Sequence, residues 1–178
     1  MLGDFVRLDP ETLARLRETP LEAYHQLTTC PNASRLDLDS MWERLSALMD
    51  AAHFPINPIA AGSPYPDEST AWGAEGDSRC LTAEEVAQAA LHLRQSPFDI
   101  LKPHLRQVLE AKAGALVNLD PDSPRYLQPL SPEEAEQVRM SDERFRDIQL
   151  VLVDDYEALV AFFDVAARGG QCTVFWAA

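Results

Sequence analysis

The stretch SDERFRDIQLVLVDDYEALVAFFDVAARGGQCTVFW, residues 141–176, decides the fold. Up to residue 168 its apolar residues recur every three or four positions, which places them on one face of an α-helix. That face consists of Phe145, Ile148, Leu152, Tyr156, Leu159, Phe163 and Ala166. A second apolar set predicts a helix enclosed on more than one side, and comprises Leu150, Val151, Val153, Val160 and Phe162. We expect one long central helix.

The ends of this helix are marked by residues suited to them. Ser141 can accept hydrogen bonds from the first turn, and Gly169 can take the left-handed conformation that closes a helix. One alternative stays open within it: residues 148–153 are a short apolar run that is also compatible with a buried strand. The three- and four-residue spacing favours a single helix.

A strand follows the glycine break. Residues 172–176, CTVFW, are rich in β-branched and aromatic side chains. Their expected partner is the first apolar run, residues 2–8. The fold class is therefore α+β: a small antiparallel or mixed sheet pairs the N- and C-terminal strands and packs against several helices, including the long C-terminal one. We expect a single domain over residues 1–178.

Shorter helices are predicted between the two strands. Asp9-Pro10 starts one, residues 21–27 form another, and a third follows Asp39 as its N-cap. Thr82 and Glu85 form a capping box that starts a further helix. Asp37 and Asp39 also fit a carboxylate pair for metal or acid/base work, but capping explains them more simply.

Residues 53–78 form a long predicted loop, with a short strand at 58–61. Four prolines and three glycines interrupt any period there, and loops of this length are often functional. Aromatic residues are enriched at interface cores, so the aromatic and acidic residues of the loop are a predicted partner-binding surface. The alternative is that the loop folds back onto the core. The predicted binding residues are Tyr65, Asp67, Glu68, Trp72, Glu75 and Asp77.

The chain is strongly acidic. Among 178 residues there are 29 Asp and Glu against 15 Lys and Arg, a formal net charge of −14. Such a field repels nucleic acid and anionic lipid and speeds encounter with a basic protein. No apolar run is long enough to span a bilayer, and the N-terminus lacks signal-peptide features, so we expect a cytoplasmic protein. Solubility alone is the simpler explanation of the charge.

Motifs for catalysis and metal binding are absent from the sequence. It has no GxSxG, HExxH, GxGxxG or phosphate-binding loop. Three scattered cysteines and four scattered histidines indicate neither a zinc site nor a disulfide framework. We therefore predict no catalytic residue, no metal and no cofactor. An enzyme whose site is assembled by folding around Asp37, Arg79 or His53 is the alternative.

Several segments together resemble the YfbM-like family of small bacterial proteins. They are FVRLDPETL (5–13), LDLDSMWERLSALM (36–49), the approach from Gly76 to TAEEVAQAALHL (82–93), and YEALVAFFDVAARGGQCTVFWA (156–177). The resemblance implies an α+β fold with paired termini. Glu43 and Ser46 stand where the family pattern tends to carry histidines, so the resemblance transfers no catalytic residue.

Three functional hypotheses follow. The first is a non-enzymatic binding protein with a basic partner, for example an immunity protein that neutralises a bacterial toxin. The second is a small enzyme of unknown reaction. The third is a domain that self-associates through its closing strand. A nucleic-acid binder is disfavoured because the only lysines are Lys102 and Lys112.

Overall fold

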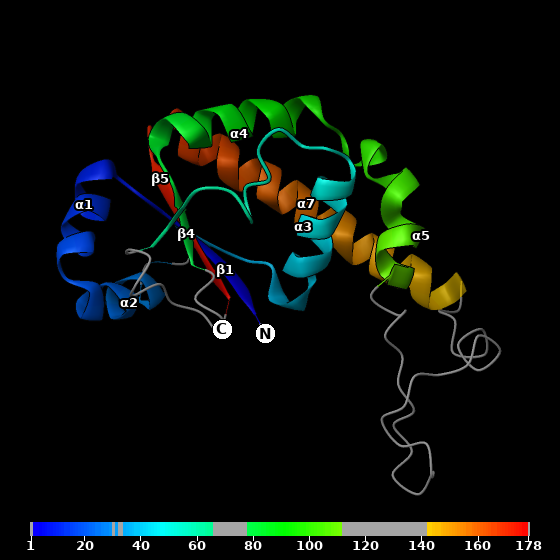
Figure 1. Cartoon of the computed structure of the whole chain (residues 1–178), viewed down its shortest axis with the longest axis horizontal. Helices are drawn as coiled ribbons and strands as arrows, with labels where there is room; N and C mark the ends of the chain where they lie inside the picture. Colours follow the sequence, from blue (N-terminus) through cyan, green and yellow to red (C-terminus); the bar gives the residue numbers. More distant parts are fainter. Residues whose placement is uncertain (1, 30, 32–33, 66–77, 112–141, 178) are drawn as a thin grey trace, which may run out of the picture.

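The computed structural model describes residues 2–29, 31, 34–65, 78–111 and 142–177. Helices and strands alternate irregularly along the chain (Figure 1). In order they are β1 (Gly3–Leu8), α1 (Pro10–Glu18), α2 (Pro20–Thr28), β2 (Arg35–Asp37), the 3-10 turn η2 (Asp39–Met41), α3 (Trp42–Ala51), β3 (Ser63–Pro64), β4 (Arg79–Leu81), α4 (Ala83–Gln95), the 3-10 turn η3 (Phe98–Ile100), α5 (Lys102–Ala111), α7 (Asp142–Arg168) and β5 (Cys172–Ala177).

The strands form one sheet in the order β2-β1-β5-β4-β3, and every neighbouring pair is antiparallel. β1 and β5 pair along their whole length, from Gly3 opposite Ala177 to Leu8 opposite Cys172. The two ends of the chain therefore lie together (Figure 1). The predicted α+β fold with paired terminal strands is confirmed.

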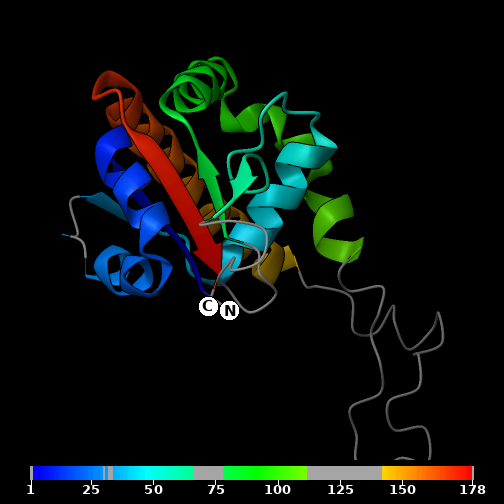
Figure 2. The same cartoon turned by 60° about the vertical axis from the view of Figure 1, so that its left-hand side comes forward.

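β5 is the central strand, and it is buried at every position. Figure 2 shows it as the long red arrow in the middle of the molecule, with β4 in green beside it. A strand covered on both faces needs a continuous apolar run, which Cys172–Ala177 supplies. Because β5 has a neighbour on each side, it offers no free edge for pairing with a second copy.

Alternate residues of β1 and β5 serve opposite faces of the sheet. Phe5 and Phe175 belong to the core formed with α3, α4, α5 and α7, whereas Val6 and Trp176 belong to the core formed with α1 and α2. The Phe5 ring lies 5.6 Å from Phe163 and 4.9 Å from Phe175 between centroids. Aromatic packing thus joins α7 to the two terminal strands.

α7 is one uninterrupted helix, so residues 148–153 are helical and the predicted long helix is confirmed. Its proposed cap, Ser141, lies outside the described residues. The prediction that apolar residues enclose it on more than one side is wrong in part: Leu150 is 64% and Val151 45% exposed, because they lie on the side turned away from the sheet. The buried residues are Leu152, Tyr156, Leu159, Phe162, Phe163 and Ala166.

The two predicted helix caps at Thr82 and Asp39 have different outcomes. The capping box at Thr82 and Glu85 is confirmed. Asp39 does not cap a helix: it has a φ of 46°, and its N–H donates to Oδ1 of Asp37 at 2.7 Å. The Asp37 side chain thus accepts the first N–H of the 3-10 turn that precedes α3, whose N-cap is Leu38.

The short strands differ from the prediction. Residues 57–61 form a turn in which the Ala61 N–H donates to the Asn57 carbonyl, and the strand comes later, at Ser63–Pro64. β2 and β4, three residues each, were not predicted. Strands this short carry too little period-2 signal to be recognised from sequence.

Candidate functional site

The outer face of α7 is the exposed surface with the clearest chemical character. From residue 147 to 165 the helix has no Lys or Arg, and three of its carboxylates, those of Asp147, Asp154 and Glu157, are exposed. Leu150, Val151 and Val165 are exposed among them. Acidic and apolar side chains thus share one solvent-facing stripe, a composition suited to a partly apolar partner of opposite charge. We call this surface the outer face and define it by Asp147, Leu150, Val151, Asp154, Glu157 and Val165.

An aspartate cluster adjoins the outer face where α7 packs beside β2 and η2. It consists of Asp37, Asp39, Asp154 and Asp155. Burial, followed by repulsion from the other three carboxylates, raises the pKa of Asp155 from its ordinary value of 3.8 to about 6. Within the described ranges, Oδ2 of Asp155 is buried and accepts no hydrogen bond. The cluster is therefore a concentration of negative charge.

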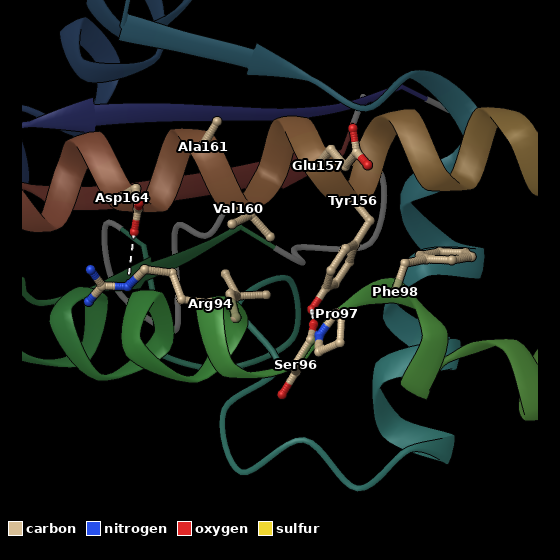
Figure 3. Close-up of a pocket in the computed structure, with 10 residues that line it drawn as sticks. Arg94, Ser96, Pro97, Phe98, Tyr156, Glu157, Val160, Ala161 and Asp164 are labelled. Carbon is tan, nitrogen blue, oxygen red and sulfur yellow. Dashed lines mark hydrogen bonds and ion pairs between the residues drawn. The ribbon is translucent and has the colours of Figure 1, made fainter.

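A pocket of 460 Å³ lies between the C-terminal part of α4 and α7 (Figure 3). This volume falls in the range of about 300–1,000 Å³ typical of ligand sites. Its walls are mainly apolar. On the side of α7 facing α4, Tyr156 donates its hydroxyl hydrogen to the Ser96 carbonyl at 2.5 Å. The lining residues are Leu93, Arg94, Ser96, Pro97, Phe98, Tyr156, Glu157, Val160, Ala161 and Asp164.

The charged residues of this α4/α7 pocket are two carboxylates and one guanidinium, so the lining is net negative. Nε of Arg94 lies 3.3 Å from Oδ1 of Asp164. That contact is an ion pair without hydrogen-bond geometry, and across the described residues Oδ1 accepts no hydrogen bond although it is buried. In Figure 3, Asp164 reaches toward Arg94, whereas Glu157 points away from α4 at the outer rim. The pocket therefore opens beside the outer face.

A second cleft, of 640 Å³, lies between α1 and the start of α4. Its polar residues include Arg17, Ser63, Cys80 and Cys172. A side-chain N–H of Arg17 donates to Sγ of Cys80 at 2.8 Å and to Oγ of Ser63 at 3.3 Å. Burial raises the pKa of the Cys172 thiol, which keeps it neutral. Arg17 thus binds α1 to the sheet, which is a structural use of its charge.

Tyr65 is the one predicted binding residue that the structure describes. It is fully buried, and the Arg17 guanidinium lies 5.6 Å from the centre of its ring. Burial raises its pKa. This position agrees with the alternative in which the loop folds back onto the core. The other predicted binding residues, Asp67, Glu68, Trp72, Glu75 and Asp77, lie outside the described residues, so their role stays a prediction.

The residues suggested for a fold-assembled active site do not line the three cavities described for residues 2–29, 31, 34–65, 78–111 and 142–177. A third pocket, of 340 Å³, is lined by residues of α4 and the segment after α3, including His92. Asp37, Arg79 and His53 line none of these three cavities. In the described parts of the chain, no three His, Cys, Asp or Glu residues come together to hold a metal ion. Nor does any described helix have the length and apolarity to cross a membrane.

Sequence reasoning missed the α4/α7 pocket. One signal was available: Glu157 and Asp164 are seven residues apart, two helical turns, and therefore share one side of the helix. Nothing in the sequence showed that α4 lies opposite them with Arg94 and Pro97. That juxtaposition depends on how the two helices pack, which the periodicity of each helix does not encode.

Comparison with known proteins identifies the family. The family model DUF1877, a domain of unknown function, matches residues 1–117, and the chain belongs to this family. The fold is that of the crystal structure of YfbM, a protein of unknown function from Escherichia coli. The match has a TM-score of 0.59 and 19% sequence identity, and it covers 98% of each chain. No curated protein matches the sequence. The resemblance to the YfbM-like family is thereby confirmed.

Proposed function

We propose that the protein is a non-enzymatic binding module that docks a basic protein on the outer face of α7. The observation that carries the proposal is the composition of this face, where Leu150 and Val151 are exposed beside Asp154 and Glu157. Exposed apolar side chains supply contact area, and the surrounding carboxylates select a partner of opposite charge.

The charge of the whole chain supports the same proposal. A net charge of −14 attracts a basic protein over a distance of about one Debye length and raises its association rate. The aspartate cluster adds local negative charge beside this face. A toxin neutralised by docking, which would make this chain an immunity protein, is one partner of this kind. We place the interaction in the cytoplasm, in keeping with the free thiols of Cys80 and Cys172.

Affinity capture from the source cell's lysate, at low and at moderate salt, tests the proposal with three baits. One bait is the natural chain, the second carries Asp154→Lys and Glu157→Lys, and the third carries Glu18→Lys and Glu22→Lys. The last two share the same change in net charge, but Glu18 and Glu22 are exposed on α1 and α2, across the sheet. Comparing these two variants therefore separates the effect of the outer face on capture from the effect of net charge.

The expected result is one stoichiometric basic protein that the natural chain and the α1/α2 variant capture and the outer-face variant does not. Moderate salt should weaken its capture. Equal capture by both variants, or capture of no basic protein, would contradict the proposal. If the captured protein is a nuclease or another toxin, its inhibition by this chain tests the immunity role.

The acidic residues of the predicted loop form a separate arm of the same test. Reversing the charge of Glu75 and Asp77 should slow association with the captured partner and leave folding intact, because charges at the edge of an interface act mainly on the association rate. An unchanged association rate would show that the loop lies outside the docking surface.

A further inference from the structure

We propose that the α4/α7 pocket receives a basic side chain, Arg or Lys, from the partner protein. The inference rests on the proposed function and adds the chemical group that the surface recognises. Three features of the pocket carry it: apolar walls, carboxylates at two ends, and an unsatisfied acceptor on Asp164.

The apolar walls suit the methylene stem of such a side chain. Leu93 of α4 lines the pocket. Pro97, just after α4, and Val160 and Ala161 of α7 line it as well (Figure 3). Long basic side chains bury their stems along apolar surface and keep the charged group at a polar end. The pocket offers that arrangement, because its middle is apolar and its charged residues stand at the ends.

Asp164 supplies an acceptor for the charged group, and Glu157, at the outer rim, adds negative charge at the mouth of the pocket. Glu157 and Asp164 are separated by about 10 Å along the helix axis, since each residue rises about 1.5 Å. Oδ1 of Asp164 is buried and accepts no hydrogen bond from the described residues. Because the contact of this buried oxygen with Arg94 lacks hydrogen-bond geometry, a cationic donor that reaches it with better geometry gains more than it would at an exposed carboxylate.

Arg94 partly occupies the position beside Asp164 that the incoming cation would take. Its Nε lies 3.3 Å from Asp164, and its side chain is 52% exposed, so the ion pair is long and its cation is half in solvent. Such pairs contribute little and exchange readily. Arg94 therefore acts as a competitor of the incoming cation, and removing its charge should strengthen binding. If Arg94 only stabilised the fold, removing its charge should weaken binding instead.

Titration of the full chain with N-acetyl-L-arginine N-methylamide, followed through backbone amide resonances, tests the inference without a partner protein. Saturable shifts are expected at residues 93–96, at Phe98 and at residues 156–164. The citrulline analogue, which has the same shape without the charge, should bind at least about tenfold more weakly. N-acetyl-L-lysine N-methylamide should bind at the same place.

Two variants and one control sharpen this test. Glu157→Gln should weaken binding of the arginine probe about fivefold, and Arg94→Gln should tighten it by a similar factor. Glu143→Gln, an exposed change near the start of the same helix, should leave binding unchanged. Thermal unfolding of each variant shows whether the fold is retained.

Several results would overturn the inference. They are equal binding of the citrulline analogue, shifts that map elsewhere, and weaker binding by Arg94→Gln with the fold retained. Tighter binding of 1,4-diaminobutane than of the arginine probe would indicate a site for free amines instead. If the probe binds and no basic protein is captured, the proposed function is contradicted but the pocket inference is not. If a protein is captured and the probe does not bind, only the pocket inference fails.

Discussion

The inner and outer faces of α7 differ in almost every property, although they belong to the same 27 residues. Inner residues such as Tyr156 and Phe163 are buried against the sheet and α4, whereas Leu150 is 64% exposed. The residues of the inner face pack in the hydrophobic core, and this packing explains why they are apolar. The outer face contributes little to the core, so its exposed apolar residues call for another explanation. The comparison teaches that stability and recognition can be separated on one helix.

The largest effect is expected on the inner face. Phe163→Ala removes a fully buried ring that packs 5.6 Å from Phe5 between centroids. We expect the free energy of unfolding to fall by about 3–5 kcal/mol, as for other buried phenylalanines. Urea unfolding followed by circular dichroism measures this. A loss below about 1 kcal/mol would show that α7 is not the centre of the core.

A smaller loss is expected where the inner face meets the pocket. Tyr156→Phe keeps the ring but removes the hydroxyl that donates to the Ser96 carbonyl. Since the bond is buried, we expect a loss of about 1–2 kcal/mol in the same unfolding experiment. No change in stability would indicate that the Ser96 carbonyl finds another donor.

Asp155 lies at the border between the inner and outer faces of α7. Its contribution to the free energy of unfolding should depend on pH. Its pKa in the folded chain is about 6, above the ordinary 3.8, so the folded state holds the proton more tightly than the unfolded state. The resulting stability is present below about pH 4 and is lost as the pH rises through about 6.

Asp155→Asn removes this dependence. After allowance for solvent screening of the partly exposed carboxyl, we expect the variant to be about 1 kcal/mol more stable than the natural chain at pH 7. The difference should vanish near pH 4. Urea unfolding at the two pH values measures it, and an equal difference at both would exclude the titration of Asp155 as its cause.

The smallest effect on stability is expected on the outer face. Leu150→Ser alters an exposed side chain, so the free energy of unfolding should change by no more than about 0.5 kcal/mol. Partner capture should nevertheless weaken, because Leu150 supplies apolar contact area at the proposed interface. A large loss of stability would mean that the outer face belongs to the core, and the contrast between the faces would fail.

The sequence predicts the elements of the fold that are formed by long segments with a clear residue pattern. α7 follows from the spacing of its apolar residues, the closing strand from its β-branched and aromatic residues, and the capping box from Thr82 and Glu85 three positions apart. β2 and β4 did not, because three residues are too few to establish a period. The exposure of Leu150 and Val151 was also missed, since apolar character is the same whether a residue packs or binds.

The candidate site was less predictable than the fold. The aspartate cluster joins Asp37 and Asp39 to Asp154 and Asp155 across more than a hundred residues of sequence. The α4/α7 pocket likewise needs two helices placed side by side. Acidic composition pointed to the kind of partner, but only the packing of α7 shows which carboxylates face solvent together.

The association rate of the captured basic partner, measured at two salt concentrations, tests the central claim most directly. Asp154→Lys with Glu157→Lys should slow association about tenfold at low salt, because these charges steer the encounter, and moderate salt should reduce the difference. Glu18→Lys with Glu22→Lys should have much less effect. Equal slowing by both pairs would show that only the net charge matters and would contradict a docking role for the outer face of α7.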